Sequence, residues 1–178
     1  AGCMATPVIV EALRTPLGKE DGAFADTRSE DLSIPLVNEI LSNTGLSGED
    51  VDDLLWACAQ QREEQGNNIG RVIALMSELG ESVPASTVNR WCASSAESVM
   101  RAADAIAAGQ RDVLIAGGVE SMSRVKMGEN THNVHPRLND YYNVGELQMG
   151  MTAEKVAEKF DISREAQDEY AYRSHERA

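Results

Sequence analysis

Apolar side chains follow two patterns along the first 120 residues, namely short continuous runs and runs with intervals of three or four. The short runs, which are typical of buried strands, lie at 7–12, 51–59, 83–88 and 113–116. The spaced runs, which are typical of one helix face, lie at 32–45, 69–79 and 96–107. The order βαβαβαβ predicts a layered α/β fold in which right-handed crossovers connect the strands of a sheet.

Residues that commonly begin or end helices support these boundaries. Ser29 or Ser33 is a candidate N-cap for the first helix, and Gly45 fits its end. Gly80 and Gly109 fit the ends of the next two helices, because glycine accepts the left-handed conformation in which many helices terminate.

The pattern changes after Glu120. Residues 121–150 are rich in Gly, Asn, Met, His and Tyr and show no sustained period. Two helices are expected beyond this stretch, the first over about 152–160. The second begins near Ser163, a candidate N-cap with an acidic residue in the first turn behind it.

Composition removes several classes of function. A net charge of −13 repels a phosphodiester backbone, so we expect no nucleic-acid partner. No apolar run approaches the roughly 20 residues that span a bilayer, so no membrane span is expected. The first residues lack the pattern of a secretory signal, which favours a cytoplasmic location. Three cysteines without paired Cys or Cys/His spacing predict neither a disulfide framework nor a metal site.

Cys92 is the candidate nucleophile. It lies in VNRWCASS, where an extended segment is expected to turn into a helix. Backbone N–H groups in the first turn of a helix lack internal partners, so they can stabilise a thiolate or a developing oxyanion. The small residues after Cys92 leave room for a substrate carbonyl, and Asn89 can orient the loop through hydrogen bonds to the backbone. The residues alone leave another interpretation open, a cysteine packed as a small apolar side chain.

Four segments resemble parts of the thiolase superfamily: VIVEALRTPLGK, VNRWCASS, IAGGVESMSR and MGMTAEKVAEKFDISREAQDEYAYRSHERA. They follow one another in the family's order from about Val8 to Ala178. The resemblance implies a thiolase-like layered fold with a mixed sheet. Residues 1–120 would form the N-terminal thiolase domain and residues 121–178 the first part of the loop domain that covers the substrate. The C-terminal thiolase domain, which completes a five-layer arrangement, is expected to be absent.

The resemblance also implies a reaction. A thiolase cleaves 3-ketoacyl-CoA to acetyl-CoA and a shortened acyl-CoA, or runs the reverse Claisen condensation, through an acyl group on Cys92. Coenzyme A would be a substrate, and no tightly bound cofactor is expected. Met149, within QMGM, matches a position where thiolases often have a Met near the pantetheine arm. Gln148 stands where biosynthetic members often have His, so the acyl chain length stays open.

The groups that would move protons are not recognised in this sequence. The family's catalytic His lies in a Gly-His-Pro-like motif and its second Cys in a Cys-x-Gly-Gly motif, and neither motif occurs here. We therefore expect this chain alone to be inactive. A longer enzyme or a separate C-terminal-half chain would supply these groups, in a homo-oligomer that is a dimer or a tetramer. No base is assigned among the three histidines, His132, His135 and His175.

Two alternatives to a thiolase reaction remain. One is a catalytically silent assembly or interaction domain that keeps the cysteine for packing. The other is a cysteine hydrolase, which would need a histidine near the thiol. Other residues are expected to shape the same region: Cys58 as a packed, inert thiol, Gln60 and Gln61 at a strand end, and Gly117 and Gly118 where the backbone is approached closely.

Overall fold

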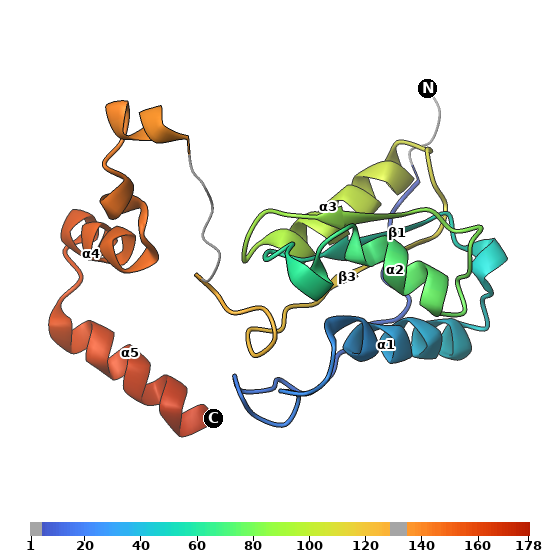
Figure 1. Cartoon of the computed structure of the whole chain (residues 1–178), viewed down its shortest axis with the longest axis horizontal. Coiled ribbons are helices and arrows are strands. Elements are labelled where there is room, and N and C mark those ends of the chain that lie inside the picture. The colour runs from blue at the N-terminus through green and yellow to red at the C-terminus, as the bar shows by residue number, and fades with distance from the viewer. Residues whose placement is uncertain (1–4, 129–134) are drawn as a thin grey trace. The chain divides into compact units, whose positions relative to one another are not determined.

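The computed structural model describes residues 5–128 and 135–178 (Figure 1). The chain forms two compact units, Ala1–Glu129 and Asn130–Ala178. Within the described ranges, no helix combines the length and the hydropathy that crossing a bilayer requires.

A three-stranded parallel sheet forms the centre of the first unit. Its strands are β1 (Asp53–Ala57), β2 (Ala85–Val88) and β3 (Leu114–Gly118), in the order β2-β1-β3. These are three of the four predicted strands. Ala57 pairs in register with both Val88 and Gly118, so the carboxyl ends of all three strands lie at the same edge.

Three helices cover this sheet: α1 (Ser29–Thr44), α2 (Ile69–Met76) and α3 (Ser94–Ala107). α2 connects β1 to β2, and α3 connects β2 back to β3 on the far side of β1. Because these crossovers run in opposite directions across the sheet, right-handed connections place their helices on opposite faces. α1 packs beside α2, and α3 contacts all three strands (Figure 1). The layered α/β architecture predicted from the sequence is confirmed.

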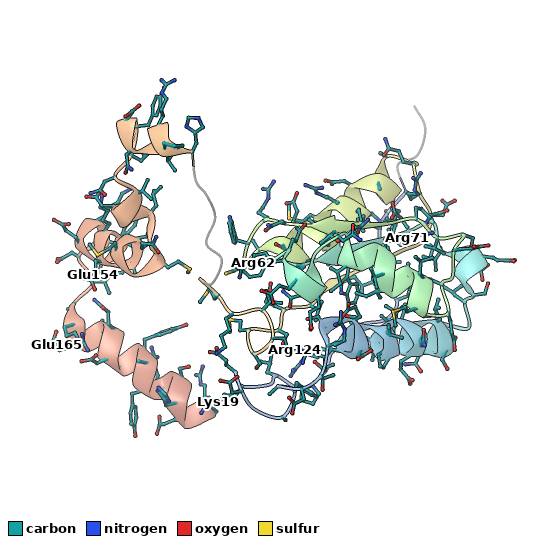
Figure 2. The ribbon with its side chains drawn as sticks, viewed as in Figure 1. Lys19, Arg62, Arg71, Arg124, Glu154 and Glu165 are labelled. Carbon is teal, nitrogen blue, oxygen red and sulfur yellow. The ribbon has the colours of Figure 1, made fainter. Side chains whose placement is uncertain are left out.

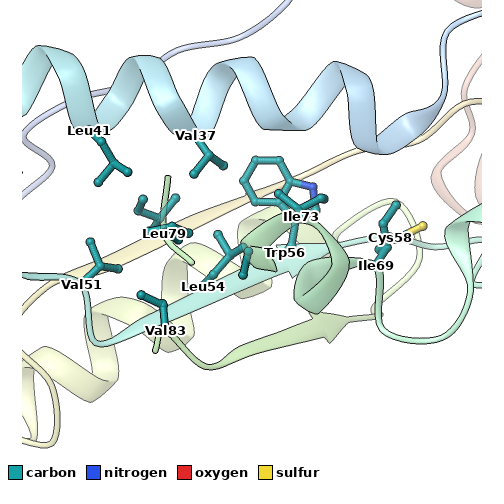
Figure 3. Packing of buried hydrophobic residues seen from close by; sticks show 12 residues of the cluster. Val37, Leu41, Val51, Leu54, Trp56, Cys58, Ile69, Ile73, Leu79 and Val83 are labelled. Atoms are coloured by element: carbon teal, nitrogen blue, oxygen red, sulfur yellow. The ribbon is translucent and has the colours of Figure 1, made fainter. Parts of the chain in front are cut away.

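The main apolar core lies between β1 and the helices α1 and α2 (Figure 3). Its side chains alternate along β1 and recur at helical intervals in the two helices, as the period of each element requires. The buried residues of this cluster are Val37, Leu41, Val51, Leu54, Trp56, Cys58, Ile69, Ile73, Ala74, Leu79, Val83 and Ile115.

The start of α1 differs from the prediction. Arg28, not Ser29 or Ser33, occupies the N-cap, and both serines are buried inside the helix. Ser33 Oγ accepts a hydrogen bond from Trp56 Nε1 (3.2 Å), and Ser29 Oγ donates to Gln65 Oε1 (2.8 Å). The predicted caps are wrong because these hydroxyls pair with Trp56, with Gln65 and with the Ser29 carbonyl, and do not accept from the N–H groups at the helix start.

The first predicted strand, over residues 7–12, is also wrong. Val8, Ile9 and Val10 are between 72% and 77% exposed. This segment and β3 line the same apolar cavity of about 840 Å³, and within the described residues the segment is not part of the sheet. The sheet within the described residues is therefore parallel throughout, without the antiparallel strand of a mixed sheet.

The second unit consists of short helices. They are the 3-10 helices η3 (Pro136–Asp140) and η4 (Val144–Leu147), followed by α4 (Met149–Phe160) and α5 (Arg164–Arg177). Ser163 caps α5 as predicted, since its Oγ accepts from Ala166 N (3.2 Å). α4 begins earlier than predicted, so Met149 is helical and does not lie in a loop. None of the residues described in this unit is buried.

Candidate active site

The candidate groups gather where the three strands end. Cys58 directly follows β1, Asn89 directly follows β2, and Glu120 lies two residues beyond β3. Parallel α/β sheets commonly bind ligands outside the carboxyl ends of their strands. This edge of the sheet is therefore where the structure favours a site.

Cys92 lies in the connection between β2 and α3, two residues before the helix begins, and it is exposed. Ala93 is the N-cap and contributes no side-chain hydrogen bond to the helix start. The first-turn N–H groups of such a helix have no intrahelical acceptors and carry partial positive charge, which favours an anion at this position. The predicted setting, a cysteine at a strand-to-helix turn, is confirmed.

Asn89 holds one side of the turn that carries Cys92. Its Oδ1 accepts from the backbone N–H of Trp91 (2.8 Å), and its Nδ2 donates to the carbonyl of Ala59 (3.2 Å). Trp91 has a φ of 50°, a left-handed conformation that is uncommon for a residue with a side chain. The orienting role predicted for Asn89 thus has two specific backbone partners.

Ser94 holds the other side of the turn. Its hydroxyl is buried, accepts from Arg90 N (2.7 Å) and donates to the carbonyl of Trp91. The backbone adds a bond from Ala93 N to Arg90 O (3.1 Å). The backbone around Cys92 is consequently fixed by side chains at both ends of a six-residue segment.

Glu120 supports the neighbouring end of β1. Its Oε2 accepts from the backbone N–H of Ala59 (2.9 Å) and of Gln60 (3.4 Å), and its Oε1 accepts from Gln65 Nε2 (2.6 Å). Gln65 is fully buried and also donates to Gln60 O (2.9 Å). Sequence reasoning missed both residues. The available signal for Glu120 was an acidic residue directly behind a predicted parallel strand.

Cys58 has surroundings unlike those of Cys92. It is 1% exposed, and its Sγ lies 4.0 Å from Glu120 Oε1. Burial, followed by the negative charge of Glu120, raises the pKa of the Cys58 thiol to about 12. A thiol that stays protonated at neutral pH is a poor nucleophile. The structure agrees with the prediction of a packed and inert cysteine.

Gly118 lets the start of α3 approach the sheet. A Cβ atom at this position would lie 2.6 Å from both Ser95 Oγ and the Cβ atom of Ala57. At Gly117, a Cβ atom would lie 2.7 Å from the ring of Trp56. The close approach predicted for these two glycines is confirmed: Gly118 packs against the start of α3, and Gly117 packs against Trp56 of the main core.

An ion cluster fastens the chain beyond Glu120 to the start of α1. Glu64, in the 3-10 helix η2 (Glu63–Gln65), pairs with Arg124 at 2.7 Å and with Arg28 at 3.4 Å. Figure 2 labels Arg124. Burial would raise the pKa of Glu64, but the hydrogen bond and charge of Arg124, with the charge of Arg28, outweigh burial and lower it.

The remaining sequence-predicted residues lie in the second unit. Met149 is the first residue of α4 and is exposed, so its role near a pantetheine arm stays a prediction. His135 Nδ1 accepts from Arg137 N (3.2 Å), and His175 is exposed in α5. His132 lies outside the described residues. The structure assigns no catalytic role to the described histidines.

Comparison of the sequence with known proteins finds a matching family model and curated relatives. The sequence matches the family model "Thiolase, N-terminal domain" over residues 7–178. It is 46% identical over 177 residues to a 3-ketoacyl-CoA thiolase of Serratia proteamaculans (strain 568). It is 44% identical over 177 residues to one of Yersinia pestis (strain Pestoides F). Each match covers 98% of this chain and 46% of the relative, so the chain spans about half the length of these curated relatives.

A solved structure gives the same result for the fold. The crystal structure of the Bacillus anthracis acetyl-CoA acetyltransferase is similar with a TM-score of 0.81 and 32% sequence identity. The match covers 98% of this chain and 47% of that chain.

Proposed function

Because the chain belongs to the thiolase family, of which it contains the N-terminal domain, we propose that it is part of a thiolase-type acyltransferase with Cys92 as its nucleophile. The observation that carries the proposal is the setting of Cys92. An exposed thiol lies just before α3, at the sheet edge where sites form, in a turn held by Asn89 and Ser94.

The proposed cleavage proceeds in two half-reactions. The Cys92 thiolate adds to the 3-keto carbon of a 3-ketoacyl-CoA, and the bond between carbons 2 and 3 breaks. The electron pair of that bond leaves with acetyl-CoA, which takes up a proton, and the acyl group stays on Cys92 as a thioester. The thiol of coenzyme A then loses its proton and attacks this thioester. The bond between the acyl carbon and Cys92 Sγ breaks, the shortened acyl-CoA leaves, and the Cys92 thiolate is restored. In the second half-reaction one thioester replaces another of similar energy, so this acyl transfer is reversible.

The backbone around Cys92 is suited to the charge that develops during these steps. Attack on a carbonyl carbon places negative charge on its oxygen, and N–H groups directed at that oxygen lower the barrier. We assign one such donor to the backbone N–H of Cys92. Coenzyme A acts as a substrate, and Met149 would lie near its pantetheine arm. Residues 1–120 and 121–178 would be the N-terminal domain and the first part of the loop domain.

Proton transfer requires groups that we do not find in this chain. A catalytic His and a second Cys are expected from a C-terminal half, whether it belongs to a longer enzyme or to a separate chain. The assembly would be a homo-oligomer in the cytoplasm. The names of the curated relatives favour 3-ketoacyl-CoA as the substrate class.

Complementation tests this proposal. The chain is mixed with a polypeptide carrying Gly-His-Pro and Cys-x-Gly-Gly motifs, and acetoacetyl-CoA and coenzyme A are added. We expect acetyl-CoA from the mixture, little from the chain alone, and none when Cys92→Ala replaces the wild type. Normal turnover by the chain alone would contradict the proposed division of roles. Release of a free carboxylic acid would favour a hydrolase, and a complex without any product would favour a silent assembly domain.

A further inference from the structure

We propose that Asn89 is a positioning residue for Cys92, which ties the turn of Cys92 to the end of β1. The inference rests on the proposed function, because it concerns the geometry of the nucleophile. Asn89 is not assigned to contact the substrate. It acts through the backbone of Trp91 on one side and of Ala59 on the other.

The bond to Trp91 stabilises an unfavourable backbone conformation. Trp91 immediately precedes Cys92 and has a φ of 50°. Non-glycine residues keep such a conformation only where surrounding contacts impose it. Asn89 Oδ1 receives the Trp91 N–H at 2.8 Å, a contact of the type by which Asn stabilises turns two residues ahead. Ser94 also holds the carbonyl of Trp91, through its hydroxyl and through its backbone N–H at 3.0 Å. Loss of the Asn89 acceptor would therefore release the N–H side of Trp91 alone, which weakens the constraint on its φ and on the peptide that leads into Cys92.

The bond to Ala59 fixes this turn relative to the sheet. Asn89 Nδ2 donates to Ala59 O at 3.2 Å, although the two residues lie thirty positions apart. The N–H of the same residue, Ala59, donates to Glu120 Oε2 at 2.9 Å. The chain segments that follow β1, β2 and β3 are therefore joined by one series of hydrogen bonds through Ala59.

Displacement of the turn would slow the acylation of Cys92 more than it would change the access of a reagent to its sulfur. Cys92 is already exposed, so a looser turn gives a reagent little additional access to its sulfur. Reaction with a thioester requires a defined line of attack, and a small displacement of the attacking atom slows it strongly. Substitution of Asn89 should thus lower the maximal rate of Cys92 acylation and leave thioester binding largely unchanged.

Two variants of Asn89 and one matched control separate positioning from stability. Asn89→Ala removes both bonds. Asn89→Ser keeps a short acceptor for Trp91 N–H but is too short to reach Ala59, and it provides a second measurement if the alanine variant fails to fold. The control is Asn38→Ala, because Asn38 Oδ1 accepts one backbone bond, from Glu78 N at 2.9 Å, away from the turn.

The measurement is the rate of Cys92 acylation by acetyl-CoA in the full chain mixed with the polypeptide that carries the Gly-His-Pro and Cys-x-Gly-Gly motifs, followed by peptide mass spectrometry at several acetyl-CoA concentrations. Urea unfolding of each variant chain is measured in parallel. We expect Asn89→Ala to lower the maximal rate by about tenfold or more, without a matching change in the half-saturating concentration. Asn89→Ser should lie between it and the wild type. Asn38→Ala should keep the wild-type rate even if its stability falls equally.

Two results would overturn the inference. One is a wild-type maximal rate in both Asn89 variants. The other is equal slowing in Asn89→Ala and Asn38→Ala, which would make the effect one of stability. If the wild-type chain forms no acyl-Cys92 in this mixture, the proposed function fails and the inference fails with it. Wild-type acylation combined with unaffected Asn89 variants would remove the inference alone.

Discussion

The two described cysteines lie at the same edge of one sheet, but they differ in exposure and in the charge beside them. Cys92 is exposed before the start of a helix, whereas Cys58 is buried beside the carboxylate of Glu120. A thiolate is stabilised near backbone N–H groups and destabilised near a negative charge in a buried position. Burial and the Glu120 carboxylate thus account for the raised pKa of the Cys58 thiol.

Selective labelling should reveal this difference. Because burial and the charge of Glu120 raise the pKa of the Cys58 thiol to about 12, this thiol stays almost entirely protonated at the mildly alkaline pH used for labelling. We expect iodoacetamide to label Cys92 at least about a hundredfold faster than Cys58, as read by peptide mass spectrometry. In urea the two rates should converge, which controls for the sequence around each cysteine. Equal labelling in the folded chain would contradict the assignment of Cys58 as inert.

At the scale of residues, the local sequence predicted that Cys92 lies at a strand-to-helix turn. It did not predict that Glu120 and Gln65 hold the neighbouring end of β1. The turn signal lies within VNRWCASS itself, where extended and helical patterns meet. The contacts of Glu120 with Ala59 and Gln65 join residues 61 and 55 positions apart. Such pairs depend on which strand ends become neighbours, and a single sequence without its fold does not supply that information.

At the scale of elements, the approach of α3 to the sheet depends on one missing side chain. The Cβ atom of an alanine at position 118 would lie 2.6 Å from Ser95 Oγ and from the Cβ atom of Ala57, and 2.8 Å from the Ala57 carbonyl oxygen. Even if the Ser95 hydroxyl rotates away, β3 must shift relative to β1. We expect Gly118→Ala to lower the free energy of unfolding by about 1 to 3 kcal/mol, as overpacking commonly does, and to slow Cys92 acylation.

Gly150→Ala is the matched control for this substitution. Gly150 lies in α4, and an added Cβ would meet nothing within 4 Å. Alanine there should be neutral or stabilise by about 0.5 to 1 kcal/mol. Equal stabilities and equal acylation rates for the two glycine variants would contradict the packing role of Gly118.

The ion cluster of Glu64 makes a separate prediction about pH. The folded pKa of Glu64 is lowered below its ordinary value of 4.5, so its stabilising effect is present above that value and is lost as the pH falls. We expect Glu64→Gln to lower the free energy of unfolding by about 1 to 3 kcal/mol near neutral pH.

The difference between wild type and Glu64→Gln should shrink in urea titrations below about pH 4.5, since the wild-type carboxylate then becomes protonated. Glu39→Gln, at an exposed position in α1, serves as the control and should change stability little. A loss at Glu64 that does not vary with pH would contradict the role of its charge.

Element boundaries were predicted best where an apolar run had partners on both sides. β1 and the helices around it follow the period of their side chains. The run at residues 7–12 has the composition of a strand, but it lines a cavity and has no ladder with β3. Apolar composition predicts that a segment is suited to a strand, and pairing depends on a neighbour that the pattern does not specify.

At the scale of the whole molecule, the two units differ in how they are stabilised. The first has a continuous buried core, whereas none of the described residues from 135 to 178 is buried. Helices without buried apolar surface depend on propensity and local pairs, which give marginal stability in water.

Unfolding in urea should therefore occur in two steps. Trp56 and Trp91 both belong to the first unit, whereas the four tyrosines belong to the second, so fluorescence excited selectively at tryptophan follows the first unit. Far-UV circular dichroism also follows α4 and α5, and we expect part of its helical signal to disappear at lower urea than the change in fluorescence. Coincident transitions by the two probes would contradict this prediction.

The claim that Cys92 is the acyl-accepting nucleophile is tested most directly by isolating the acyl enzyme. The chain, mixed with the polypeptide that carries the Gly-His-Pro and Cys-x-Gly-Gly motifs, is incubated with isotopically labelled acetyl-CoA, and its peptides are analysed by mass spectrometry. The account predicts one acetyl group on the peptide containing Cys92, released by hydroxylamine as a thioester is and absent from Cys92→Ser. An unmodified Cys92, or equal acetylation of Cys58, would contradict it.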